Sequence, residues 1–242
     1  MRNVVFQFVA ASAMTALCAA PALAAPINPI NSGRPITPNQ GDGPVGGMQT
    51  ILDSIYSCTG CVNAIKGQSS VGMWSLSGLF PTTDPVLDFE FAGNASTNTF
   101  GIWSGTDTGS ITTAQIFSGP AGPGSAALLT WLGPDSLSIN GGAPVAISDA
   151  GFGFYIGTAA GNFYSVDQLN GGSAQMLDYV QPSTDRWVFG FEDVNGGDAD
   201  FNDLVVSTES LDPVPEPGSM MLFGTGLLGL GGAIRRRLGK IA

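Results

Sequence analysis

The chain has 242 residues and a formal net charge of −11, from 19 acidic and 8 basic residues, and it contains no histidine. The absence of histidine excludes Ser-His-Asp and Cys-His catalysis, histidine-ligated zinc and histidine-based pH sensing. The acidic balance argues against a nucleic-acid partner, because neutralising phosphates requires clustered lysine and arginine.

The N-terminus has the three parts of a secretory signal peptide. A basic start is followed by an apolar run to about Ala20 and by an A-x-A cleavage site at residues 22–24. We therefore predict a signal peptide over residues 1–24. The alternative, a lipoprotein anchored through Cys18, is disfavoured by Leu17, which stands where lipoprotein processing requires a small residue.

The next segment, residues 25–47, holds five prolines and little apolar content. Such a composition is typical of an extended polyproline-type linker. From residue 48 the apolar side chains recur at helical spacing, which predicts a short amphipathic helix. The residues that carry this spacing are Met48, Ile51, Leu52, Ile55 and Tyr56.

Beyond the helix, apolar residues alternate with polar ones at a period of two, as in β-strands. Clusters of Gly, Pro, Asn and Asp separate the apolar runs. The candidate strands are residues 87–91, 100–103, 127–132, 152–156, 163–166, 187–191 and 204–207. We predict a mainly β fold, with a single β-sandwich or jelly-roll-like domain over residues 48–212 and a short N-terminal helix. A signal peptide and a C-terminal transmembrane helix flank this domain.

Two cysteines of the mature chain, Cys58 and Cys61, form a C-x-x-C pair. In an oxidising compartment this pair predicts a structural disulfide that fixes a turn. The alternative is a redox centre, but thioredoxin-like pairs lie between a strand and a long helix. Here a short predicted helix precedes the pair and a glycine soon follows it.

Asp88 and Glu90 project from the same face of one predicted strand. Paired carboxylates carry out glycoside hydrolysis, and β-sandwich glycosidases often place them in an E-x-D-x-E pattern. Val86 stands where the first glutamate of that pattern would be, so the nucleophile is missing. The alternative is a half-buried strand that shows two acids to solvent. Exposed tryptophans would offer stacking surfaces for sugar rings, and the candidates are Trp74, Trp103 and Trp131.

The acidic stretch at residues 192–203 holds five carboxylates, two asparagines and no cation. It separates two apolar runs, as expected for a long hairpin loop. Two carboxylates about 6 Å apart repel by about 3 kcal/mol at an effective dielectric constant near 20, so a screening cation is expected. Oxygen ligands at this density suit Ca²⁺, which we predict as the cofactor. The predicted ligands are Asp193, Asn195, Asp198, Asp200, Asn202 and Asp203.

The loop is not an EF-hand. If Asp193 were the first position, Asp198 and Leu204 would stand where that motif needs glycine and glutamate. The alternative to a calcium site is a solvated acidic turn in which Asn and Gly supply the turn conformations.

The acidic loop and its flanking runs, residues 187–193 and 198–206, resemble the end of the domain-of-unknown-function family 4114. Residues 92–103 and 151–155 are similar to earlier strands of that family, so the resemblance covers about residues 48–210. It implies a β domain of secreted bacterial proteins with no established catalytic activity. It also implies an acidic, calcium-binding loop at Asp193, Asp198, Asp200 and Asp203.

The C-terminal residues 213–242 contain a Pro-Glu-Pro sequence, an apolar stretch and a basic cluster. At 1.5 Å per residue, residues 218–234 form a helix of about 25 Å, and we predict a transmembrane helix there. The arginines after it are expected to hold the tail on the cytoplasmic side. This order of features resembles the PEP-CTERM sorting signal of bacteria that produce exopolysaccharide. The residues that carry the resemblance are Pro215, Glu216, Pro217, Arg235, Arg236 and Arg237.

The PEP-CTERM resemblance implies an exosortase-type processing enzyme as partner, which recognises the signal and removes the tail after export. The alternative is an ordinary single-pass anchor. We predict a non-catalytic protein exported from a Gram-negative-type bacterium and held transiently in the inner membrane. Its expected destination is the cell surface or extracellular matrix, as a calcium-stabilised biofilm protein associated with exopolysaccharide. The alternative function is a polysaccharide-binding or glycoside-hydrolysing β-sandwich that uses Asp88 and Glu90.

Overall fold

The computed structural model describes residues 24–31, 36–39, 46–77, 81–90, 94–119, 121–181, 183–215 and 225. Within these residues the elements are one short α-helix, one 3₁₀ turn (η1, Asp167–Asn170) and thirteen strands. The predicted fold class, mainly β with one short helix, is therefore confirmed. The helix α1, Met48–Ile55, begins at the first residue of the predicted helical spacing.

All strand pairs are antiparallel, and they form three sheets. The largest sheet has the order β13-β1-β8-β4-β5, with β9 beside β8, and the other two have the orders β10-β11-β12-β3 and β2-β6-β7. The strands are β1 Trp74–Leu76, β2 Thr82–Thr83, β3 Val86–Phe89, β4 Thr99–Ser104, β5 Thr112–Phe117, β6 Leu129–Gly133, β7 Ser136–Ile139, β8 Phe152–Thr158, β9 Gly161–Tyr164, β10 Met176–Gln181, β11 Arg186–Phe191, β12 Leu204–Thr208 and β13 Leu211–Pro213.

An aromatic core joins the three sheets. The rings of Trp74 in β1, Phe154 in β8 and Phe189 in β11 have centroids 4.9–5.8 Å apart. Trp131 in β6 stacks on Phe152 in β8 at 4.9 Å, which brings the third sheet into the same core. Each such pair contributes about 0.5–1.5 kcal/mol beyond the burial of its surface. The sheets are therefore held to one another by side-chain packing.

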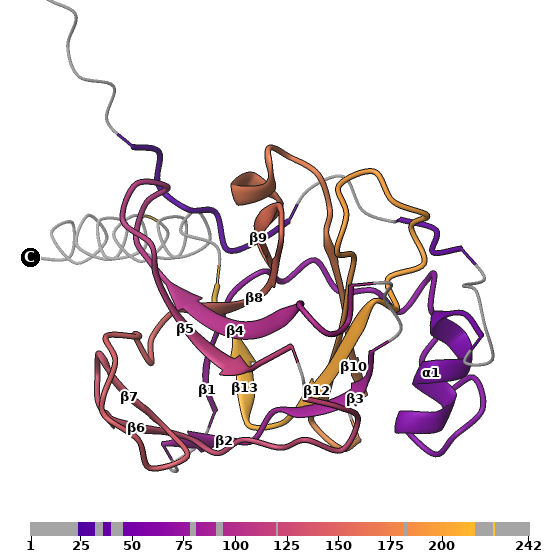
Figure 1. The fold of residues 1–242 in the computed structure, drawn as a ribbon, viewed down its shortest axis with the longest axis horizontal. Coiled ribbons are helices and arrows are strands. Elements are labelled where there is room, and N and C mark those ends of the chain that lie inside the picture. The colour runs from indigo at the N-terminus through magenta and orange to yellow at the C-terminus, as the bar shows by residue number, and fades with distance from the viewer. Residues whose placement is uncertain are drawn as a thin grey trace, which may run out of the picture.

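The sheet β10-β11-β12-β3 is covered on its other side by α1. Successive strand residues point to opposite faces, so Phe189 of β11 enters the aromatic core while Val188 packs into a second cluster with α1. The helix contributes Met48, Ile51 and Leu52, all at most 1 % exposed. Figure 1 shows α1 at one side of the molecule, next to β3, β10 and β12. The strands that flank the acidic loop are thus buried on both faces.

Parts of the segment predicted as a linker pack on the domain. Ile27 is buried, and Ile30 forms an isolated β-bridge with Val71. The side-chain amide of Asn31 donates a hydrogen bond to the Ser165 carbonyl at 2.9 Å. The described residues of this segment form no helix or strand of their own, but they belong to the folded unit.

No helix within the described residues is long and apolar enough to span a bilayer. The predicted signal peptide, residues 1–24, and the predicted transmembrane helix, residues 218–234, lie outside the described residues except for positions 24 and 225. Most of the sorting motif also lies outside them, whereas Pro215 is described and is exposed.

Candidate functional site

The acidic residues 192–203 join β11 to β12, so the predicted hairpin loop is confirmed. Phe191 and Leu204 are paired in register, which brings the two ends of the loop together. The loop then folds back over β11, where a Cβ atom on Gly190 would lie 2.5 Å from the Phe201 carbonyl oxygen. Glycine at position 190 is therefore what allows the loop to lie against the strand.

Three carboxylates converge in this loop. Glu192, Asp198 and Asp200 each place an oxygen within 4.8 Å of the other two. Glu192 and Asp200 are 3 % and 1 % exposed, whereas Asp198 is exposed. The Phe201 backbone N–H donates to Glu192 Oε1 at 2.6 Å, which ties the start of the loop to its end. We call these three residues the carboxylate trio; such a group of oxygen ligands can hold a hard cation.

The trio only partly overlaps the ligands predicted from sequence. Asp198 and Asp200 were predicted, whereas Glu192 was not, because the predicted set began one residue later. Glu192 is nevertheless the first carboxylate of the acidic run, and its position directly after β11 was visible in the sequence. A ligand search that includes the residue at the strand end would have found it.

Asp193 and Asp203 lie outside the trio and are bound by donors of the protein. Oδ2 of Asp193 accepts hydrogen bonds from the side-chain amides of Asn94 and Asn98, at 3.2 and 2.9 Å. Oδ2 of Asp203 accepts a hydrogen bond from the Asp193 backbone N–H at 2.8 Å. These two aspartates therefore fix the path of the loop around the trio.

Two buried amide side chains of this region keep polar atoms without a described partner. Asn202 is 1 % exposed, and neither its Oδ1 nor its Nδ2 is hydrogen-bonded within the described residues. The Asn202 backbone N–H donates to Asp200 Oδ1 at 3.2 Å, so this residue lies beside the trio. Gln175 Oε1 is also unpaired, although Nε2 donates to Asn195 Oδ1 at 3.2 Å. Each unpaired buried group costs about 1–3 kcal/mol, so these polar atoms are available to a ligand or to ordered water.

A surface hollow of about 230 Å³ opens beside these groups. Gln175, Glu192 and Asn195 line it, together with the exposed Val194. Glu192, although almost fully buried, is thus next to a space that an ion could enter.

The electrostatics of the loop favour a bound cation. Within the described residues, no lysine or arginine forms a salt bridge with any carboxylate of the loop. Burial, and to a smaller extent the charges of Asp200 and Asp198, raise the pKa of Glu192 to about 7. Burial and neighbouring carboxylates likewise raise the pKa of Asp203 to about 7. A nearby positive charge would favour the ionised forms of both groups and lower these pKa values.

The backbone of the loop is held in a conformation that side chains rarely adopt. Ala199 and Phe201 have φ values of 62° and 57°, in the left-handed region. The Phe201 side chain is buried in the cluster under α1. Asn39 donates from its backbone N–H to the Ala199 carbonyl at 2.8 Å and from its side chain to the Asp198 carbonyl. Because such strain persists only where the surroundings impose it, these contacts preorganise the trio.

The carboxylates of the alternative catalytic hypothesis, Asp88 and Glu90, lie at the end of β3. The Asp88 carboxylate lies 3.9 Å from the Arg186 guanidinium. Burial raises the pKa of Asp88, while Ser207 and Arg186 lower it. Glu90 Oε1 is buried without a described partner, and burial raises the pKa of Glu90 to about 7. No tryptophan offers a stacking surface for sugars, since all four are at most 3 % exposed: Trp74, Trp103, Trp131 and Trp187.

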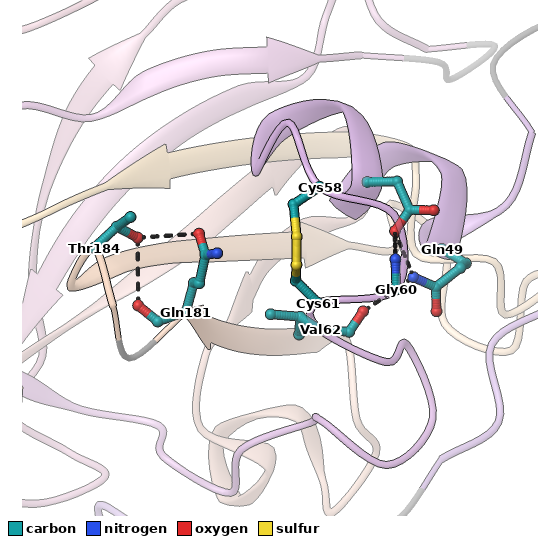
Figure 2. Close-up of a disulfide and its surroundings, with 8 residues drawn as sticks. Gln49, Cys58, Gly60, Cys61, Val62, Gln181 and Thr184 are labelled. Atoms are coloured by element: carbon teal, nitrogen blue, oxygen red, sulfur yellow. Dashed lines mark hydrogen bonds between the residues drawn. A yellow bond between two sulfur atoms is a disulfide. The ribbon is translucent and has the colours of Figure 1, made fainter.

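A disulfide joins Cys58 to Cys61 just after α1, with the two Cα atoms 5.7 Å apart (Figure 2). Asp53 of α1 ties this turn to the helix, since its Oδ1 accepts hydrogen bonds from the Gly60 N–H and from the side chain of Gln49, at 2.8 and 2.9 Å. The helix precedes both cysteines, whereas a thioredoxin-like pair lies at the start of a long helix. This arrangement favours a structural role, in which the bond closes the turn that ends the helix.

Two family models match the chain. The PEP-CTERM protein-sorting motif matches residues 213–237, and the domain of unknown function DUF4114 matches residues 140–210. Both predicted resemblances are confirmed, the second over residues 140–210 and not over the whole predicted range of residues 48–210. The matched part includes the acidic loop with both flanking strands. No curated protein and no solved structure matches the chain. The sorting motif marks an exported protein that exosortase recognises and that is anchored transiently in the membrane before display at the cell surface.

Proposed function

We propose that this exported protein is a non-catalytic component of the bacterial surface or biofilm matrix, associated with exopolysaccharide and stabilised by Ca²⁺. The cation binds at the carboxylate trio of Glu192, Asp198 and Asp200. The observation that carries this proposal is the convergence of three carboxylates beside Asn202, a fully buried amide with no described side-chain partner.

Calcium fits this donor set better than other common cations. All the ligands are oxygens, and they come from one irregular loop. Ca²⁺ accepts six to eight oxygens in flexible geometry, whereas Mg²⁺ demands a near-ideal octahedron and dehydrates reluctantly. Extracellular modules bind Ca²⁺ with dissociation constants of about 10⁻⁴–10⁻³ M, so a modest site would be filled outside the cell.

The charge of the exported part supports the role in the matrix. Residues 25–217 contain all 19 acidic residues and three basic ones, a net charge of −16. Such a surface repels anionic polymers unless divalent cations intervene. Bound calcium therefore both relieves repulsion inside the loop and permits contact with an acidic polysaccharide.

Thermal melting of the purified exported protein tests the metal site. At Ca²⁺ tenfold above its dissociation constant, linkage stabilises the fold by about 1.4 kcal/mol, a rise in Tm of about 4 °C. Glu192→Gln and Asp198→Asn should remove this rise. Asp107→Asn, the same change of charge in another turn, should retain it. An unchanged Tm at millimolar Ca²⁺ would refute the metal site.

Incubation with the exopolysaccharide of the producing bacterium tests the proposed role. Retention of the protein that needs Ca²⁺, with no new reducing ends, supports a non-catalytic matrix protein. New reducing ends that disappear in Asp88→Asn or Glu90→Gln would instead support the glycoside-hydrolysing alternative.

A further inference from the structure

The strand β5 has one side that no described segment covers. It pairs with β4 on its other side and lies at the end of the largest sheet. In an antiparallel pair, every second residue points its N–H and C=O away from the partner strand. No backbone hydrogen bond joins these groups of β5 to another described segment. The strand therefore presents a row of free donors and acceptors.

The other long edges of the described sheets are covered. An additional segment bonds to the open side of β3, β7 and β10, through the backbone contacts Leu87–Ser125, Leu137–Val145 and Ser69–Asp178. The remaining edge strands β2, β9 and β13 are two to four residues long, and short edges resist pairing. Six-residue β5 is thus the longest open edge in the described structure (Figure 1).

The sequence of this edge carries little protection against pairing. Natural edge strands use lysine, proline, a charged inward residue or a β-bulge to block another strand. β5 has a bulge at Ile116, since Phe117 and Gln115 pair with the consecutive residues Phe100 and Gly101, and its regular part is residues 112–115. Residues 108–134, which include β5, contain no charged residue. The side chains of Thr112, Thr113 and Gln115 are exposed and uncharged. In a domain with a net charge of −16 over residues 25–217, β5 itself brings no carboxylate to a second copy, although Asp135 lines a hollow together with Thr112.

We propose that β5 is an interface between two copies of this protein. The two β5 strands pair antiparallel about a two-fold axis and extend the largest sheet from one copy into the next. A two-fold contact uses the same patch on both partners, and an antiparallel pair of identical strands meets this requirement with the same donors and acceptors. The contact does not involve the carboxylate trio and therefore does not depend on the calcium site.

Sedimentation velocity of the purified exported protein over a range of concentrations, in EGTA, tests this interface. A dimer is expected, and added salt should strengthen it, because the net charges of the two copies repel. Gln115→Glu, which has nearly the same shape, places two carboxylates close to the axis. It should weaken association by about tenfold.

Asn162→Asp is the matched control, since it makes the same change of charge at an exposed position of β9. It should dimerise as the unchanged protein does. Thermal melting shows that each variant is folded. A protein that stays monomeric at every concentration and salt level overturns the proposal, as does a dimer that Gln115→Glu leaves intact. Weakening by salt would indicate a contact through opposite charges and would also contradict it.

Discussion

The turn between β4 and β5 and the loop between β11 and β12 both use acidic side chains, but in different surroundings. In the first, Asp107 is half-buried and its Oδ1 accepts a hydrogen bond from the Gly109 N–H at 2.9 Å. In the second, Glu192 and Asp200 are almost fully buried, and the neighbouring Asn202 side chain has no described partner. In the β4–β5 turn, a backbone N–H of the same turn donates a hydrogen bond to the carboxylate. In the β11–β12 loop, some buried polar atoms have no hydrogen-bond partner within the described residues.

This difference shows when acidic residues indicate a ligand. The number of carboxylates is a weak signal, because an exposed aspartate in a turn is satisfied by backbone and water. Burial together with unpaired neighbouring amides is a stronger one, since the cost of leaving such groups unpaired must be offset. By this measure the β11–β12 loop is a better candidate for a binding site than the β4–β5 turn.

The largest expected effect comes from substituting alanine for one glycine in each region, Gly190 beside the β11–β12 loop and Gly105 in the β4–β5 turn. A Cβ on Gly190 would lie 2.5 Å from the Phe201 carbonyl oxygen, and one on Gly105 would lie 2.5 Å from the Ser110 carbonyl oxygen. Each substitution should lower the free energy of unfolding by about 3 kcal/mol, because rigid backbone must shift. Gly190→Ala should also remove the stabilisation by Ca²⁺, whereas Gly105→Ala should keep it. Urea denaturation with and without Ca²⁺ measures both effects.

Gly133→Ala is the control for this experiment, since a Cβ there meets no atom within 4 Å and should change stability little. Loss of the calcium response in Gly105→Ala would contradict the assignment of that response to the β11–β12 loop.

Removal of the disulfide should lower the free energy of unfolding by a smaller amount and should leave the β4–β5 turn and the β11–β12 loop unchanged. The loop closed by Cys58 and Cys61 spans four residues, for which the chain-entropy relation gives about 2 kcal/mol. The double variant Cys58→Ser/Cys61→Ser should lose about this much stability in urea denaturation. Its Tm should still rise with Ca²⁺, because neither cysteine contributes a ligand. A lost calcium response would show that the turn after α1 supports the acidic loop.

The smallest effect is expected at Glu90, a half-buried carboxylate outside the loop. Burial raises its pKa from 4.5 to about 7. The stability contributed by its protonated form is therefore fully present below the unfolded pKa and is lost as the pH rises through about 7. Glu90→Gln should raise stability at pH 8 by on the order of 1 kcal/mol and leave it nearly unchanged at pH 4. Urea denaturation at the two pH values measures this. A less stable variant at pH 8 would mean that the ionised carboxylate has a favourable partner.

The strands that the sequence predicted are those with aromatic or aliphatic residues at every second position, such as β8 and β11. Two of the missed strands, β5 and β10, lack that pattern for identifiable reasons, whereas β1 and β7 show it over only three and four residues. In β5 the exposed residues Thr112, Thr113 and Gln115 interrupt the apolar series. In β10 a buried aspartate, Asp178, stands among apolar residues. The pattern reports which faces are apolar, so strands with polar or exposed positions were not detected.

The acidic loop was predicted from composition, but its internal arrangement was not. Asp193 is bound by Asn94 and Asn98, which lie about a hundred residues away in the chain. Ala199 and Phe201, on either side of Asp200, adopt left-handed conformations. Both features depend on tertiary contacts, which local sequence does not encode.

The last strand, β13, ends at Pro213, the residue at which the sorting motif begins. The Val214 N–H donates to the Met73 carbonyl at 3.0 Å, so the folded structure reaches the residue just before Pro215. An extended residue spans about 3.4 Å, which leaves almost no slack between the domain and the motif. The sequence that marks the chain for exosortase therefore begins directly beside the paired strands β13 and β1, with no linker between the folded domain and the motif.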